Sequence, residues 1–203
     1  MILLFSIVSF KNFIPMKTIM ALLTFQFLIL LNVAAQERFT ADTLQTKLLW
    51  LGEKVTGQHT GTVYLKSGWI TWKDNKIVSG EFDIDMTSLK ESESNARLEG
   101  HLKSDDFFAV VKFPVAILSI TGSTSFDKGN GVVTGTLTIK GITNPLEFKA
   151  ALQKKDEGMW FYANIVVDRT KYNIRYGSGN FFDNLGDKTI FDEFKLKVSL
   201  LVK

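Results

Sequence analysis

Residues 76–86 read Lys-Ile-Val-Ser-Gly-Glu-Phe-Asp-Ile-Asp-Met, and apolar and polar side chains alternate along this stretch. The apolar residues share one parity, with Gly80 in the gap between them: Val78, Phe82, Ile84 and Met86. The polar residues share the other parity: Ser79, Glu81, Asp83 and Asp85. Successive side chains of a strand point to opposite faces of a sheet, so the stretch predicts a β-strand with one apolar and one solvated face.

Two later stretches repeat the alternation. Residues 146–153 and 193–202 carry apolar side chains at every second position, with mostly charged side chains between them. An antiparallel sheet with one buried face and one solvated face gives this pattern. The chain is therefore predicted to be all-β, with an apolar interior and a charged exterior.

Further strands and turns follow from local composition. Short β-rich segments lie within these ranges: 46–55, 62–65, 69–72, 115–120, 132–140 and 159–167. Asp74-Asn75 and Asn130-Gly131 predict tight hairpin turns, because these residue types tolerate a positive φ. Ile142–Pro145 is expected to form a corner, and Pro145, which lacks an N–H donor, should begin a strand or lie at a sheet edge. About eight strands joined mostly by hairpins fit an up-and-down barrel or a sandwich.

Residues 87–108 interrupt the two-residue period. Leu98 and Leu102 are spaced for one face of a helix, with charged residues on the other faces. The spacing predicts one or two short helices, with a break near Gly100. Such an insert either closes one end of a barrel or forms a solvated connector, and the sequence leaves both alternatives open.

The apolar face raises the question of a lumen. A barrel of about eight strands has an interior that holds either packed side chains or one small ligand. Gly80 and Gly135 lie at inward positions and would leave space there, whereas Phe82, Phe148 and other phenylalanines supply large walls. In the alternative, the glycines mark bends or bulges and the phenylalanines fill the core. Composition alone favours this second alternative.

A membrane pore is the other barrel to consider. A pore turns its apolar face to lipid and its polar face to the lumen, so periodicity alone does not exclude one. The predicted strands lack aromatic girdles at both ends, and residues 87–108 have the pattern of an amphipathic helix. Both features favour a soluble domain.

The N-terminal 35 residues have the pattern of a secretory signal. Lys17 precedes an apolar run, and Asn32-Val33-Ala34-Ala35 supplies small residues before a cut, so cleavage is expected after Ala35. Met16 is the better initiator for a signal of ordinary length. A retained membrane anchor is the alternative, although the apolar run is short for a bilayer span. Residues 36–203 would then form a single exported domain.

Charge and cysteine content exclude several classes of function. Without Lys11 and Lys17 the chain has 22 bases against 21 acids, so no electrostatic footprint for nucleic acid remains. The chain has no cysteine, which excludes disulfides and thiol chemistry. An exported domain of this size can be held together by its core alone.

The sequence offers no catalytic constellation and no metal site. His59 and His101 are the two histidines, and neither has a cluster of ligand-type residues beside it. Ser178 lies in Tyr-Gly-Ser-Gly, which is not the G-x-S-x-G nucleophile elbow. Asp168-Arg169 follows a strongly apolar strand. Arg169 either closes the barrel end by binding strand carbonyls or meets the polar head of a ligand, for which its fork is suited.

Several segments together resemble the YceI-like family of bacterial exported proteins. They are Gly-Thr-Leu-Thr-Ile-Lys-Gly-Ile-Thr-Asn-Pro-Leu at 135–146, Val-Asp-Arg-Thr-Lys-Tyr-Asn-Ile at 167–174, the closing strand at 191–202, and Trp-Leu-Gly-Glu-Lys-Val-Thr-Gly-Gln-His-Thr-Gly at 50–61. The resemblance covers nearly all of residues 36–203. Asn173 stands where many members have glycine, and asparagine is the next best residue for a left-handed backbone.

The resemblance implies an eight-stranded antiparallel lipocalin-like barrel with a short helical insert around residues 88–108. It also implies a long hydrophobic pocket for a polyisoprenoid or a similar amphiphile such as a quinone tail, and it favours a cavity over a packed core. We expect the lumen to be lined by Phe82, Ile84, Phe113, Leu137, Ile139, Phe148 and Phe194. Arg169 and His59 are the candidates for contact with the ligand's head group.

The expected function is therefore a non-enzymatic carrier or sequestering protein, periplasmic or secreted. It would need no cofactor and no membrane span after signal removal, and the sequence leaves room for a homodimer. Two alternatives stay open. One is an enzyme that acts on an apolar substrate in the same cavity, and the other is a packed barrel that serves as an interaction or stress-response module.

Overall fold

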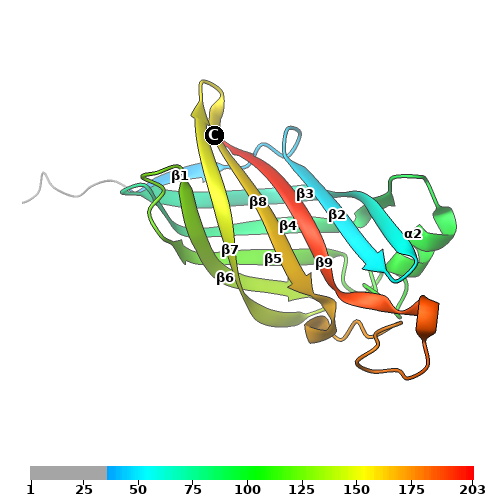
Figure 1. The fold of residues 1–203 in the computed structure, drawn as a ribbon. Helices are drawn as coiled ribbons and strands as arrows, with labels where there is room; N and C mark the ends of the chain where they lie inside the picture. The colour runs from blue at the N-terminus through cyan, green and yellow to red at the C-terminus, as the bar shows by residue number, and fades with distance from the viewer. Residues whose placement is uncertain (1–35) are drawn as a thin grey trace, which may run out of the picture. The chain divides into compact units, whose positions relative to one another are not determined.

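The computed structural model describes residues 36–203, which form one compact unit. The predicted signal segment, residues 1–35, and its cleavage site lie outside the described residues. Figure 1 shows the strands wrapped into a barrel with a short helix at one end. The strands are β1 (Glu37–Thr40), β2 (Lys47–Lys54), β3 (Gly57–Lys73), β4 (Lys76–Glu91), β5 (Val115–Ser123), β6 (Asn130–Ile139), β7 (Ile142–Lys155), β8 (Gly158–Asp168) and β9 (Ile190–Val202). The helices are α2 (Ala96–Lys103) and the 3-10 turns η2 (Arg169–Tyr172) and η3 (Gly186–Lys188).

The sheet closes on itself. The order β3-β2-β9-β8-β7-β6-β5-β4 returns to β3 through the β3–β4 pairing, and every neighbouring pair is antiparallel. β1 pairs with β3 beyond the end of β2, so β1 and β2 act as one interrupted strand. The Asp42 carboxylate holds the interruption by accepting the N–H groups of Leu44 and Gln45. The predicted eight-stranded antiparallel barrel is confirmed.

A bulge in β4 overturns one detail of the predicted pattern. Ser79 pairs with Thr71 but Ile77 pairs with Trp72, so Val78 is an extra residue on this strand. Such a bulge reverses the facing of the residues beyond it. Ile77 is therefore the buried residue, 4% exposed, whereas Val78 is 40% exposed. The assignment of Val78 to the apolar face was wrong.

The two inward glycines do not leave space for a ligand. A Cβ on Gly80 would lie 2.8 Å from the carbonyl oxygen of Trp69, and one on Gly135 would overlap the carbonyl oxygen of Ser119. Gly135 pairs with Ile120, and the register of β5 shifts directly after this pair, between Ile120 and Gly122. Both glycines therefore permit a close approach of backbones, which is the bend-or-bulge alternative.

Turn chemistry is partly as predicted. Asp74 and Asn75 have φ of 50° and 57° and connect β3 to β4. Asn130, however, begins β6 instead of making the turn, and Gly129 has the positive φ. The predicted corner at Ile142–Pro145 lies inside β7, because Lys140-Gly141, with φ of 52° and 72°, makes the two-residue turn before it.

β3 is one long strand where the sequence suggested two. It runs without a break from Gly57 to Lys73, with a register shift against β4 between Leu65 and Ser67. Gly68 lies just after this shift, and a Cβ there would overlap the ring of Phe82. The apparent gap between the two β-rich segments is therefore a bulge in a continuous strand.

One seam of the barrel is only half paired. β7 pairs with β8 from Ala150 to Lys155, and residues 142–149 of β7 have no β8 partner in the described pairings. Pro145 lies in this unpaired half, where its missing donor costs least. Asn144 bridges the far end of the seam with a side-chain hydrogen bond to the carbonyl of Lys171.

The helical insert is shorter than predicted. Residues up to Glu91 continue β4, and α2 is one helix of eight residues that contains Gly100 without a break. Asn95 caps it by accepting the N–H of Leu98, and Leu102 is buried. α2 covers one end of the barrel, so the closing alternative holds and the solvated connector does not.

Candidate functional site

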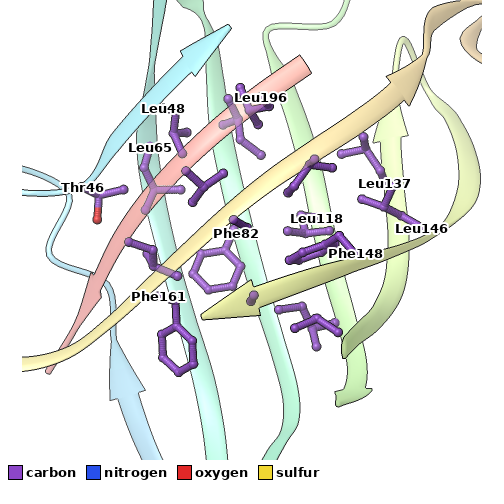
Figure 2. Close-up of a pocket in the computed structure, with 18 of the residues that line it drawn as sticks. Thr46, Leu48, Leu65, Phe82, Leu118, Leu137, Leu146, Phe148, Phe161 and Leu196 are labelled. Atoms are coloured by element: carbon purple, nitrogen blue, oxygen red, sulfur yellow. The ribbon is translucent and has the colours of Figure 1, made fainter. Parts of the chain in front are cut away.

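The inner part of the lumen contains an apolar cavity of about 90 Å³. Figure 2 shows its lining side chains converging from strands on all sides. They include Leu48, Leu65, Phe82, Leu118, Leu137, Leu146, Phe148, Ala163, Phe161 and Leu196. Thr46 is the one lining residue with a polar side chain, and its hydroxyl oxygen accepts the N–H of Leu201. The cavity therefore offers a ligand hydrocarbon contacts and no free polar group among the described residues.

A second, larger cavity of about 270 Å³ lies towards the α2 end. It shares Ile84, Leu137 and Leu196 with the inner cavity, so the two adjoin. The residues after β4 form its apolar roof: Leu98, Leu102, Phe107 and Phe108. Four residues with polar side chains also line it, and because each is at least partly exposed they mark its mouth: Glu53, Lys54, His59 and Glu193. An engineered apolar cavity of about 150 Å³ binds benzene, so this space is large enough for part of a hydrocarbon ligand.

Six of the seven predicted lumen residues line these cavities. Phe82 and Phe148 line the inner cavity, and Ile139 and Phe194 line the outer one. Ile84 and Leu137 line both.

Phe113 does not line either cavity. It precedes Pro114 and the start of β5, so the alternation of side chains along a strand does not orient it. Its ring lies 3.0 Å from where a Cβ on Gly141 would be, against the turn between β6 and β7. A contact between Phe113 and a ligand therefore has no support from the lining of the two cavities.

Arg169 forms part of the barrel end at the outer cavity. Its side chain is 2% exposed, and its donors reach five acceptors at 2.8–3.3 Å. These are the carbonyls of Ile174, Tyr176, Ile190 and Phe191 and the carboxylate of Asp192. A guanidinium has five N–H donors, so all are used. Burial lowers the pKa of Arg169, while Asp192 and Asp168 oppose that shift.

The contacts of Arg169 match the alternative in which it closes the barrel end. It joins the chain after β8 to the start of β9, because it binds carbonyls of both segments. Beside it, Asp168 caps η2 by accepting the N–H and hydroxyl of Thr170. Asn173 ends η2 with φ 58°, the left-handed conformation expected for it.

His59 lies at the mouth of the outer cavity, near a buried acid that sequence reasoning missed. Glu91 accepts the N–H groups of Glu93 and Asn95 through Oε2, and its Oε1 lies 3.5 Å from His59 Nδ1. The hydrogen bond from the Asn95 N–H lowers the pKa of the Glu91 carboxyl. The hydrogen bond from the Glu93 N–H and the nearby His59 lower it further, and burial opposes this shift. β4 carries extra residues between Asp85 and Lys90, which turns Glu91 inward. Glu91 therefore holds the segment that leads into α2.

His101 is the other functional-type residue that the sequence did not place. It lies on α2, lines the outer cavity, and packs edge-on against Tyr176 at 4.4 Å between ring centroids. Its Nε2 is buried and has no hydrogen-bond partner in the described part of the chain. The one sequence signal for this position was the helical spacing between His101 and Leu98, which indicates that both lie on the same face of a helix.

Within residues 36–203, no group of three or more histidine, cysteine, aspartate or glutamate residues is arranged to hold a metal ion. None of the helices in that range is long and apolar enough to cross a bilayer.

A closed antiparallel barrel with adjoining apolar cavities under a short helix defines a protein of the lipocalin-like barrel architecture. The family model for the YceI-like domain matches residues 39–202, and the chain belongs to that family.

Curated relatives match part of the chain. A UPF0312 protein of Shewanella denitrificans is 31% identical over 49% of this chain and 53% of its own length. A UPF0312 protein of Pseudomonas putida is 30% identical over 57% of this chain and 63% of its own length. The matched region thus spans between about half and under two thirds of these relatives.

Solved structures share the fold over most of the chain. BcnA of Burkholderia cenocepacia superposes with a TM-score of 0.66 at 19% identity, covering 80% of this chain and 99% of BcnA. A polyisoprenoid-binding domain of Saccharophagus degradans, implicated in plant cell wall breakdown, superposes with a TM-score of 0.63 at 14% identity, covering 81% and 97%. At these identities the similarity concerns the fold.

Proposed function

We propose that this protein is a non-enzymatic carrier or sequestering protein for an isoprenoid-type amphiphile, such as a polyisoprenoid or a quinone with a prenyl tail. The observation that carries the proposal is the pair of adjoining cavities, which share Ile84, Leu137 and Leu196. Their inner part is lined by hydrocarbon. The polyisoprenoid-binding domain with the same fold supports this ligand class.

The energetics favour a long tail over a small metabolite. Burial contributes about 0.8 kcal/mol per CH₂ group, so one five-carbon isoprene unit contributes at most about 4 kcal/mol. Association costs on the order of 4 to 15 kcal/mol in lost freedom. Several isoprene units must therefore be covered for firm binding, and the outer cavity extends the inner one in the way such a tail requires.

The mouth of the outer cavity favours an uncharged head group. A diphosphate head needs several cationic donors, whereas the described lining of this cavity has two, Lys54 and Arg169, together with the acids Glu53 and Glu193. All five donors of Arg169 are already bonded, so it acts as part of the barrel end. We therefore place the head group, a hydroxyl or a quinone carbonyl, near His59.

We further propose that the protein acts in the periplasm or outside the cell. The support is the signal-type pattern of residues 1–35 and the balanced charge of the remaining domain.

Native mass spectrometry tests the proposed function. Protein purified from cells should carry an extractable lipid, and delipidated protein should take up one equivalent of geranylgeraniol or of a prenylated quinone. Geranylgeranyl diphosphate should bind more weakly than the alcohol. Protein that carries no lipid and takes up none of these probes would contradict the proposal.

A further inference from the structure

Exposed aromatic side chains gather on one segment at the end of the barrel that holds the outer cavity. Among residues 36–203 the exposed phenylalanines are Phe181, Phe182 and Phe191, each 45–50% exposed. Tyr176 is exposed to the same extent. We call these four side chains the aromatic rim. All belong to the segment from the end of η2 to the start of β9, which lies at the α2 end of the barrel (Figure 1).

Two of the four rim side chains connect the rim to the cavity. Phe191 itself lines the outer cavity. The ring of Tyr176 contacts His101, which lines the same cavity. A large apolar surface around the entrance of an apolar cavity is unusual on a protein that meets only water, because such surface is normally buried.

The rim segment is held in place, so its exposure is not that of a loose loop. Arg169 binds carbonyls at both ends of the segment, at Tyr176 and at Ile190. Ser178 is fully buried, and its carbonyl accepts the N–H groups of Phe181 and Phe182. The two neighbouring rings are thereby presented in a fixed arrangement, which lowers the entropic cost of docking them.

The charge of the segment indicates what it meets. Between Asn173 and Phe191 the two bases, Arg175 and Lys188, are balanced by Asp183 and Asp187. The Arg175 guanidinium lies 4.6 Å from the centroid of the Phe181 ring. Aromatic side chains with neighbouring cations suit the interface between lipid head groups and acyl chains. A neutral segment binds such an interface through its apolar side chains, with little dependence on anionic lipid or on salt.

We propose that the aromatic rim docks on the surface of a lipid bilayer and sets the mouth of the outer cavity against it. The tail of the ligand then passes between the bilayer and the lumen without crossing water. In water, each exposed CH₂ group would lose about as much free energy as its burial contributes. This inference rests on the carrier function proposed above.

Flotation with phosphatidylcholine vesicles tests the docking. The rim variant is Phe181→Ser with Phe182→Ser, and the matched control is Leu44→Ser with Val78→Ser. Leu44 is 94% exposed in the turn before β2, and Val78 lies near the β3–β4 turn, so both are exposed apolar residues away from the rim. We expect the rim variant to bind vesicles at least tenfold more weakly than the parent, a difference of about 1.4 kcal/mol. The control should bind as the parent does.

A second measurement separates this inference from the carrier function. Uptake of geranylgeraniol in vesicle-free solution should be the same for the rim variant and the parent, whereas transfer of geranylgeraniol out of vesicles should slow at least tenfold. A parent that fails to float, or a rim variant that floats equally well, would overturn the docking proposal while leaving the carrier function intact. Flotation without any ligand uptake would overturn the carrier function alone. A rim variant that changes the sedimentation of the protein from dimer to monomer would identify the rim as a self-association face and overturn the docking proposal.

Discussion

Replacing Ala163 with phenylalanine should shorten the lumen from its inner end. Ala163 lies on β8, lines the inner cavity, and faces Ala150 across the β7–β8 seam. A phenyl ring at this position would occupy the space available to the end of a ligand tail. The outer cavity and its mouth would be unchanged.

The structure gives the size of the effect. By comparison with the cavity of about 150 Å³ that holds benzene, the inner cavity of about 90 Å³ accommodates roughly four carbon atoms, most of one isoprene unit. At about 0.8 kcal/mol per carbon, excluding them from the lumen costs at most about 3 kcal/mol. At 1.4 kcal/mol per tenfold change, Kd should rise by up to about a hundredfold.

Competition binding with a series of isoprenoid alcohols of increasing length measures this effect. Val166→Phe is the matched control, because Val166 lies on the same strand but is exposed on the outer face. Overpacking a core costs about 1–3 kcal/mol of stability, so Ala163→Leu, with a smaller side chain, provides a second variant that fills less of the cavity. Both inner variants should weaken the longest alcohols most and leave the shortest nearly unaffected.

Equal affinity of the parent and Ala163→Phe for the longest alcohols would refute the reasoning, provided that the variant unfolds as cooperatively as the parent. So would a loss of affinity in Val166→Phe of the same size. Either result would mean that the tail does not reach the inner cavity.

Three further predictions concern the stability of the barrel. Arg169→Met should lower the free energy of unfolding in urea by about 3–5 kcal/mol, because it leaves buried carbonyls and Asp192 without their donors; a stable variant that has lost only ligand affinity would show a head-group role instead. The N–H groups of residues 95 and 93 hold the pKa of Glu91 below its ordinary value of 4.5, so its contribution to stability is complete above that value and is lost as the pH falls through the lowered pKa. Glu91→Gln should accordingly have a lower urea midpoint than the parent at neutral pH, with the difference closing in acid, and a constant difference would contradict this assignment. Gly135→Ala should destabilise the barrel by about 1–3 kcal/mol, because the added Cβ would overlap the β5 backbone. Gly100→Ala has open space in α2 and should stabilise the protein by about 0.5–1 kcal/mol. Thermal unfolding of the two variants checks both values, and equal effects would refute the close-approach argument.

The antiparallel sheet could be predicted because a period of two residues survives in most strands, whereas the barrel and its lumen were implied by the family resemblance. The same period put four residues on the apolar face, and all four line the inner cavity: Phe82, Ile84, Leu137 and Phe148. Parity fails at a bulge, because one extra residue reverses the facing of everything beyond it. Val78 is the clearest case.

The site could be predicted less completely, since its polar part depends on contacts between distant segments. The sequence indicated Arg169 but could not show that its five acceptors come from the segment after η2 and from β9. Glu91 looked like one acid among several in a charged stretch, and its inward direction follows from the pairing of β4 with β3. Phe113 lies two residues before β5 begins, so the alternation of side chains along a strand could not orient it.

A crystal structure of the protein loaded with a brominated prenyl alcohol tests the central claim most directly. We predict anomalous density for a tail-end bromine in the inner cavity, between Phe82 and Phe148, with the hydroxyl near His59. Bromine density confined to the outer surface, with the lumen closed by its own side chains, would contradict the account.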